Sequence, residues 1–93
     1  MDLTNDISIG QVVKSRAGRD KGIVFLVLEI VDDQFVLVCD GDLRKLDNPK
    51  LKKIKHLIVY NTVLNELREK LDNKVKINDA YIRNLLEPFN KSF

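Results

Sequence analysis

The sequence predicts a small, mostly β protein that ends in two short helices. Short apolar segments rich in β-branched residues alternate with turn residues up to about residue 60. From Asn61 onward, leucines recur at helical spacing instead. The chain has 93 residues, of which 44% are hydrophobic, enough for one modest core without disulfides or metals.

Three strands are expected in the first half of the chain. Ile9–Lys14 is the first, and Ile23–Val31 is a longer second strand. Asp32-Asp33 forms a turn into a third strand over Gln34–Cys39, so the second and third strands should make an antiparallel hairpin. Because apolar side chains point to both faces of this hairpin, both faces need cover, either by closure of a barrel or by a helix.

Two further strands are expected after the next turn signals. Asp40–Asp42 precedes a short fourth strand over Leu43–Leu46, and Asp47–Pro49 precedes a fifth over Leu51–Val59. Glycines are expected where the backbone turns tightly or approaches another segment closely. They are Gly10, Gly18, Gly22 and Gly41. Five short strands joined by tight turns are typical of an SH3-like barrel.

Two amphipathic segments follow. Asn61 or Thr62 is expected to cap a first helix, which ends at Asp72-Asn73. Asn78 or Asp79 is expected to cap a second one. The apolar stripes are Val63, Leu64, Leu67 and Leu71 in the first helix and Ala80, Tyr81, Ile82, Leu85 and Leu86 in the second. Pro88 is expected to stop the second helix, because proline lacks the backbone N–H that a helix interior uses.

This organisation divides the chain into two parts. We expect the barrel over residues 1–60 and a helical appendage, packed on the barrel, over residues 61–93. Met1–Gly10 contains two acids and no apolar core, which is unlike a signal peptide. No apolar run is long enough to cross a bilayer, and the lone Cys39 favours a reducing compartment. A cytoplasmic location without membrane contact is therefore expected.

The charge is nearly balanced overall but unevenly distributed. Net charge is +2, from 16 basic and 14 acidic residues. Acids concentrate in predicted turns, whereas cations concentrate in two segments that could form one positive face. These cations are Lys14, Arg16, Arg19 and Lys21 in the first segment and Arg44, Lys45, Lys50, Lys52, Lys53 and Lys55 in the second. They are the candidate phosphate contacts; the alternative is a merely solvated surface.

The residues from Gly10 to Gly41 resemble a KOW motif. They read GQVVKSRAGRDKGIVFLVLEIVDDQFVLVCDG, with Gly22 at the position of the characteristic glycine of that motif. The continuation GDLRKLDNPKLKKIKHL is similar to the segment after this motif in the ribosomal protein family L-fourteen-e. The resemblance, which covers about Ile9–Val59, extends to short bacterial KOW-domain proteins. It implies an SH3-like barrel that contacts RNA, with ribosomal RNA or the ribosome as the partner.

The sequence therefore predicts a non-enzymatic RNA-binding module that needs no cofactor or metal. His56 has no second ligand at metal-binding spacing, so a structural role is expected for it, with an RNA contact as the alternative. Cys39 lies in an apolar strand and is expected to be a buried, inert thiol. The main alternative function is a protein-interaction module whose C-terminal helices dock on a partner, since a fold does not determine function.

Overall fold

The computed structural model describes residues 7–90, so the first six and last three residues of the two predicted parts lie outside it. The elements in chain order are β1 (Gln11–Ser15), β2 (Val24–Ile30), β3 (Phe35–Cys39), β4 (Lys50–Lys53), the 3-10 turn η1 (Ile54–His56), β5 (Leu57–Val63), α1 (Asn65–Asp72) and α2 (Asp79–Asn90). The predicted class, mostly β with two C-terminal helices, is confirmed for these residues.

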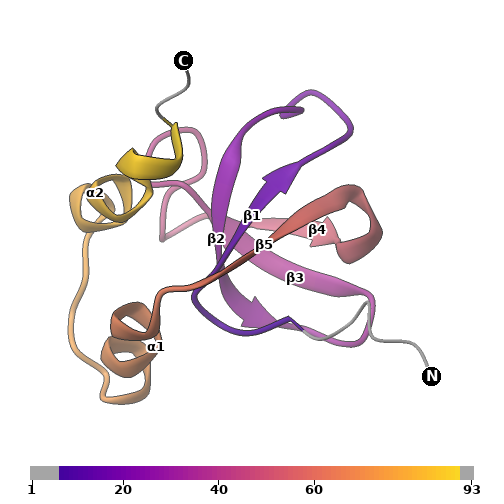
Figure 1. The fold of residues 1–93 in the computed structure, drawn as a ribbon. Coiled ribbons are helices and arrows are strands. Elements are labelled where there is room, and N and C mark those ends of the chain that lie inside the picture. The colour runs from indigo at the N-terminus through magenta and orange to yellow at the C-terminus, as the bar shows by residue number, and fades with distance from the viewer. Residues whose placement is uncertain (1–6, 91–93) are drawn as a thin grey trace.

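The strands form one antiparallel sheet in the order β4-β3-β2-β1-β5. The register shifts between Gln11 and Val13 and again between Val27 and Glu29, irregularities of the kind that bend a sheet. Because β4 and β5 stand at opposite ends of this order, the sheet is curved but not closed (Figure 1). The SH3-like barrel is therefore not confirmed.

Alternation along the strands produces two apolar cores, one on each face of the sheet. In β1, for example, Val12 belongs to one core and its neighbour Val13 to the other. The core inside the curve consists of Ile7, Val13, Phe25, Val27, Val36, Val38, Ile54 and Leu57. The core on the other face consists of Val12, Val24, Leu26, Cys39, Leu67, Ile82 and Leu86. Both faces are thus covered, as the apolar hairpin required.

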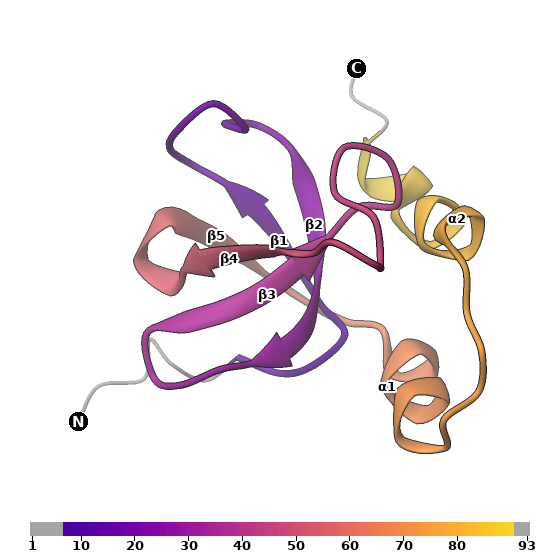
Figure 2. The ribbon, with the colours of Figure 1, turned by 180° about the vertical axis from the view of Figure 1, so that it is seen from behind.

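The two helices cover the second core. Leu67 of α1 and both Ile82 and Leu86 of α2 are fully buried against β1 and β2. Tyr60 of β5 also reaches this side, and its ring centroid lies 6.1 Å from that of Phe89. Figures 1 and 2 show both helices on one side of the sheet, with the β1–β2 loop and the β4–β5 corner extending away from them.

Two strand predictions are wrong. Leu43–Leu46 is not a strand, because Asp40 holds this segment as a turn: its Oδ1 accepts hydrogen bonds from the N–H groups of Asp42 at 3.0 Å and Arg44 at 2.8 Å. The predicted strand Leu51–Val59 is interrupted by η1, where the Ile54 side chain is buried in the core inside the curve of the sheet. This short turn allows β4 and β5 to lie in different parts of the sheet.

The first helix begins later than predicted. Asn61 and Thr62 do not cap it, because β5 continues through them and Leu64 donates its N–H to the Gly10 carbonyl at 2.8 Å. The helix begins at Asn65, with Leu64 at the N-cap and no side-chain capping bond. Its predicted end at Asp72 is confirmed.

The second helix is capped by Asn78, one of the two residues predicted for that role. Asn78 Oδ1 accepts a hydrogen bond from Tyr81 N–H at 2.8 Å. Pro88 does not stop the helix, which continues to Asn90. Pro88 has no N–H to donate to the preceding turn, so the helix loses one hydrogen bond near its end. Leu86 and Phe89 nevertheless pack on the second core, and this packing keeps the final turn against the sheet.

Candidate nucleic-acid interface

The β1–β2 loop presents three predicted phosphate contacts to solvent. Arg16, Arg19 and Lys21 are exposed, whereas Lys14 is half-buried in β1. The loop is tight because Gly18 and Gly22 adopt φ values of +86° and +91°, which residues with a side chain rarely adopt. The close turn directs the three cationic side chains outward over a short span of chain.

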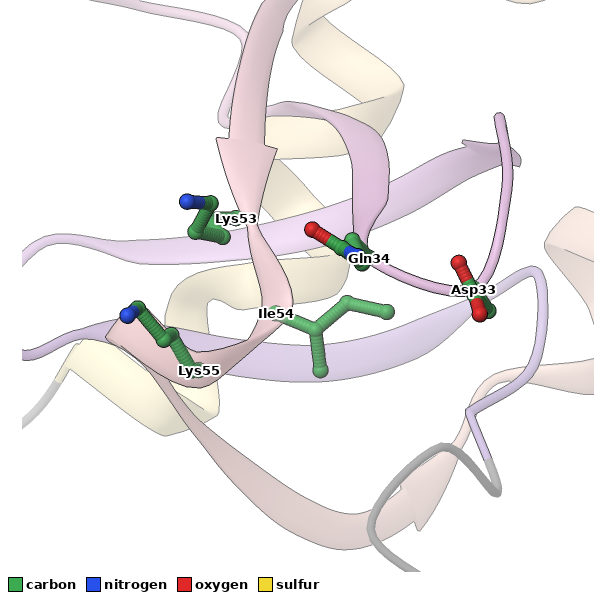
Figure 3. Close-up of a pocket in the computed structure, with 5 residues that line it drawn as sticks. All are labelled: Asp33, Gln34, Lys53, Ile54 and Lys55. Atoms are coloured by element: carbon green, nitrogen blue, oxygen red, sulfur yellow. The ribbon is translucent and has the colours of Figure 1, made fainter.

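A second group of cations lies at the β4–β5 corner. Lys55 of η1 is exposed, and Lys53 at the end of β4 is half-buried. Lys53 Nζ lies 5.6 Å from the centroid of the Phe35 ring, a cation–π contact that helps to orient it. Figure 3 shows Lys53 and Lys55 extending to the same side of the corner while Ile54 points elsewhere.

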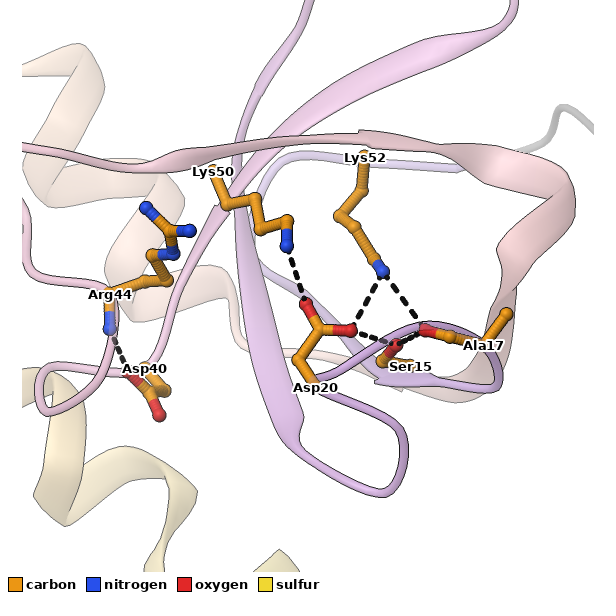
Figure 4. A network of polar contacts seen from close by, with 7 residues as sticks. All are labelled: Ser15, Ala17, Asp20, Asp40, Arg44, Lys50 and Lys52. Carbon is orange, nitrogen blue, oxygen red and sulfur yellow. Dashed lines mark hydrogen bonds and ion pairs between the residues drawn. The ribbon is translucent and has the colours of Figure 1, made fainter.

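Asp20 joins the loop to β4. Its Oδ1 accepts hydrogen bonds from Ser15 Oγ at 2.6 Å and from Lys52 Nζ at 2.9 Å, and its Oδ2 lies 3.3 Å from Lys50 Nζ (Figure 4). Lys52 Nζ also lies 3.5 Å from the Ala17 carbonyl. We call Ser15, Asp20, Lys50 and Lys52 the Asp20 cluster. It fixes the loop against a strand that lies about 30 residues further along the chain.

The charge of Asp20 is maintained by its partners. Burial by itself would raise the pKa of the carboxyl group, but the hydrogen bonds from Ser15 and Lys52 and the ion pair with Lys50 outweigh burial and lower the pKa to about 2. Asp20 is therefore ionised at neutral pH and neutralises much of the charge of the two lysines. Lys52 is 7% exposed, so its position is that of a structural partner of Asp20.

The structure brings only part of the two cationic segments together. The β1–β2 loop and β4 are in contact through the Asp20 cluster. Arg44, half-buried, and Lys45, exposed, instead lie in the β3–β4 connection beside α2, where the Leu46 N–H donates to Asp79 Oδ1 at 2.8 Å. Sequence reasoning missed the role of Asp20; its only local signal was a single acid among the loop cations.

The remaining candidate residues carry little chemistry. Cys39 is fully buried, as predicted, and burial together with Asp40 and Asp79 raises the pKa of its thiol to about 12. His56 is exposed, and residues 7–90 contain no group of three or more potential metal ligands. Of the helices in that range, none has the length and apolarity needed to cross a membrane.

Comparison with known proteins adds one relative. No model of a known protein family matches the chain, so the resemblance to KOW and L-fourteen-e proteins stays a prediction. Over 73 residues the chain is 30% identical to a protein of Bacillus subtilis (strain 168) named "Putative ribosome-binding protein YbzG". The match covers 78% of this chain and 99% of the relative. With nearly the whole relative aligned at this identity, the chain belongs to the same family as that Bacillus subtilis protein.

Proposed function

We propose that this protein is a non-enzymatic ribosome-binding protein that contacts ribosomal RNA. The observation that carries the proposal is the β1–β2 loop, in which a buried cluster supports the three exposed cations Arg16, Arg19 and Lys21. The name of the Bacillus subtilis relative supports the ribosome as the partner. Such a role would place the protein in the cytoplasm.

The proposed mechanism is phosphate neutralisation by a loop of fixed shape. Cations that pair with RNA phosphates release condensed counterions, which drives association at low salt. The Gly22 N–H donates to the Ser15 carbonyl at 2.8 Å, so it stabilises the loop itself and leaves the phosphate contacts to the side chains. Lys14, Lys53 and Lys55 would extend the contact surface, whereas Lys50 and Lys52 would act mainly through Asp20.

We also propose that the curved sheet is a KOW-type, SH3-like barrel in open form. The apolar core inside its curve supports this proposal, since Val13, Val36 and Leu57 bring three strands around one interior. The 3-10 turn η1 joins β4 directly to β5, the two strands that a closed barrel would have to pair.

The direct test is a charge-neutral loop. Arg16→Gln/Arg19→Gln should weaken binding to ribosomal RNA and reduce co-sedimentation with ribosomes. A matched control, Arg68→Gln/Lys76→Gln, removes the same charge from exposed positions on the helical side. With folding checked by circular dichroism, the loop variant is expected to lose about 10-fold or more in affinity at low salt, and the control much less.

Equal losses in the two double variants would mean that only net charge matters and would reject the loop as the contact. If the wild type binds no ribosomal RNA at low salt yet still co-sediments with ribosomes, a protein-interaction module becomes the better account. The helices would then be a weak choice for the docking element, because Leu67, Ile82 and Leu86 are already buried on the sheet.

A further inference from the structure

A pocket opens between the β2–β3 turn and the β4–β5 corner, apart from the β1–β2 loop. Its volume is about 280 Å³, just below the range typical of sites for drug-sized ligands, which suits a group the size of one nucleobase. The lining residues are Asp33, Gln34, Lys53, Ile54 and Lys55. Asp33 and Gln34 are both exposed.

The walls of this pocket are held in place by hydrogen bonds. Asp32 Oδ1 accepts from the N–H groups of Gln34 and Phe35, both at 2.8 Å, and this fixes the turn that carries Asp33. The Ile54 N–H donates to the Gln34 carbonyl at 2.8 Å, so the turn is joined directly to the corner. These bonds fix the backbone on which the lining side chains stand, so binding a ligand need not order the turn or the corner.

The pocket separates charges in a way that indicates its ligand. In Figure 3 the ammonium groups of Lys53 and Lys55 lie on one side and the Asp33 carboxylate lies on the other, with Ile54 and Gln34 between them. The first side suits a phosphate, and the second suits a group with two neighbouring N–H donors. The mostly buried Ile54 side chain lines the pocket between them.

We propose that this pocket binds one unpaired guanosine nucleotide of an RNA. Its phosphate would pair with Lys53 and Lys55, and the N1–H and N2–H donors of guanine would both bind the carboxylate of Asp33. The other RNA bases do not offer two adjacent donors of this kind on their pairing edge. Recognition of unpaired bases along that edge is the usual way in which proteins read RNA sequence.

This inference rests on the proposed function. RNA is the favoured source of the nucleotide because the β2–β3 turn and the β4–β5 corner, which line the pocket, extend away from the helices, as does the β1–β2 loop (Figures 1 and 2). A single strand could therefore place phosphates on Arg16 and Arg19 while one base enters the pocket. The loop would supply affinity for any sequence, and Asp33 would supply a preference for guanosine.

The test is a titration of the full chain, labelled with ¹⁵N, with GMP, AMP, CMP and UMP. GMP is expected to bind about 10-fold more tightly than the other three and to shift the amide signals of Gln34, Ile54 and Lys55. Asp33→Asn should abolish this preference, although removal of a negative charge would by itself strengthen binding of every nucleotide. Asp42→Asn, the same change at an exposed acid in another turn, should leave the preference intact.

Short RNAs separate this inference from the proposed function. A hexanucleotide with one guanosine among uridines should bind more tightly than hexauridine, and Asp33→Asn should remove the difference. Arg16→Gln/Arg19→Gln should weaken the binding of both RNAs but keep the difference in affinity between them. If the wild type binds ribosomal RNA but does not discriminate among the nucleotides, the pocket inference is overturned and the proposed function stands.

Two other results would also overturn the inference. One is a guanosine preference that survives Asp33→Asn. The other is a preference for free GMP in a protein that binds neither hexanucleotide, which would indicate a site for free nucleotides. A dipeptide that shifts the same amide signals when GMP does not would assign the pocket to a peptide instead.

Discussion

At the scale of single residues, Asp20 does the most to define the candidate surface. It is an acid within a cationic loop, and a simple count of charges would suggest only that it lowers the positive charge of the loop. Its side chain is 12% exposed, and its three partners lie in β1 and β4. Asp20 therefore converts two lysines of β4 into an anchor for the loop that carries Arg16 and Arg19.

Asp20→Asn is expected to destabilise the protein by about 2 kcal/mol, because the carboxylate has a pKa lowered from 3.8 to about 2 by groups that bind its charged form. Since the folded-state pKa lies below the ordinary value, this contribution is fully present above pH 3.8 and is lost as the pH falls towards 2. Urea denaturation of wild type and variant across this pH range measures both effects. The difference between them should shrink as the solution becomes acidic.

Asp42→Asn is the matched control. Because Asp42 is exposed, this substitution should change the free energy of unfolding little. RNA binding supplies a second measurement with an informative sign. Loss of the Asp20 charge makes the surface more positive, yet disorder of the loop should lower affinity. Tighter RNA binding by Asp20→Asn would show that the cluster does not position the loop.

At the scale of elements, glycines act where two parts of the fold meet. Gly41, in the β3–β4 connection, has φ of +81°, and a Cβ there would lie 2.5 Å from the Asp79 carbonyl at the start of α2. The Arg83 side chain also donates to the Gly41 carbonyl at 2.7 Å. This connection therefore fits closely against the second helix, and the close fit depends on the absence of a side chain.

A pair of alanine substitutions separates backbone strain from this close approach. Gly22→Ala introduces backbone strain at φ of +91°, but a Cβ there would meet nothing within 4 Å. The free energy of unfolding should therefore fall by only about 1 kcal/mol. Gly41→Ala adds a collision with α2 and should cost about 1–3 kcal/mol more. Thermal melts measure the difference, and hydrogen exchange should show it concentrated in Asp79–Asn90. Equal losses at the two sites would argue against close packing of α2 on the connection.

At the scale of the whole molecule, the fold separates apolar packing from exposed charge. The helices cover one face of the sheet, while the β1–β2 loop and the β4–β5 corner extend from the opposite side (Figure 2). A net charge of only +2 is therefore compatible with a locally positive surface. The salt dependence of binding reports the contacts of this surface and is a better guide to the interface than the net charge.

The slope of that salt dependence follows from the number of phosphates that the loop neutralises. The loop has three exposed cations, Arg16, Arg19 and Lys21. If each neutralises one phosphate, the logarithm of the RNA affinity should fall against the logarithm of salt concentration with a slope of about −2.1 to −2.7. Affinity should then drop about 20- to 40-fold between roughly 50 and 200 mM salt. Arg16→Gln/Arg19→Gln should reduce the magnitude of the slope by about 1.5. An unchanged slope in this variant would place the phosphate contacts elsewhere.

Local sequence was sufficient for the elements that depend on local interactions. Apolar segments rich in β-branched residues, bounded by turn residues, predicted β1, β2 and β3 to within a few residues. The Asp32 turn and the Asn78 cap use hydrogen bonds that span at most three residues. The exposed loop cations followed from the same turn chemistry. Such features are encoded over a few positions, so a pattern can predict them.

Tertiary structure decided the features that depend on distant partners. The predicted strand over residues 51–59 is broken because Ile54 enters a core assembled from residues 7–57. Pro88 remains helical because Phe89 packs beside Tyr60. Lys52 is buried because Asp20, 32 residues earlier, supplies the charge that offsets the loss of its hydration. Each outcome depends on which side chains the fold brings within a few ångströms, and no local window of sequence contains that information.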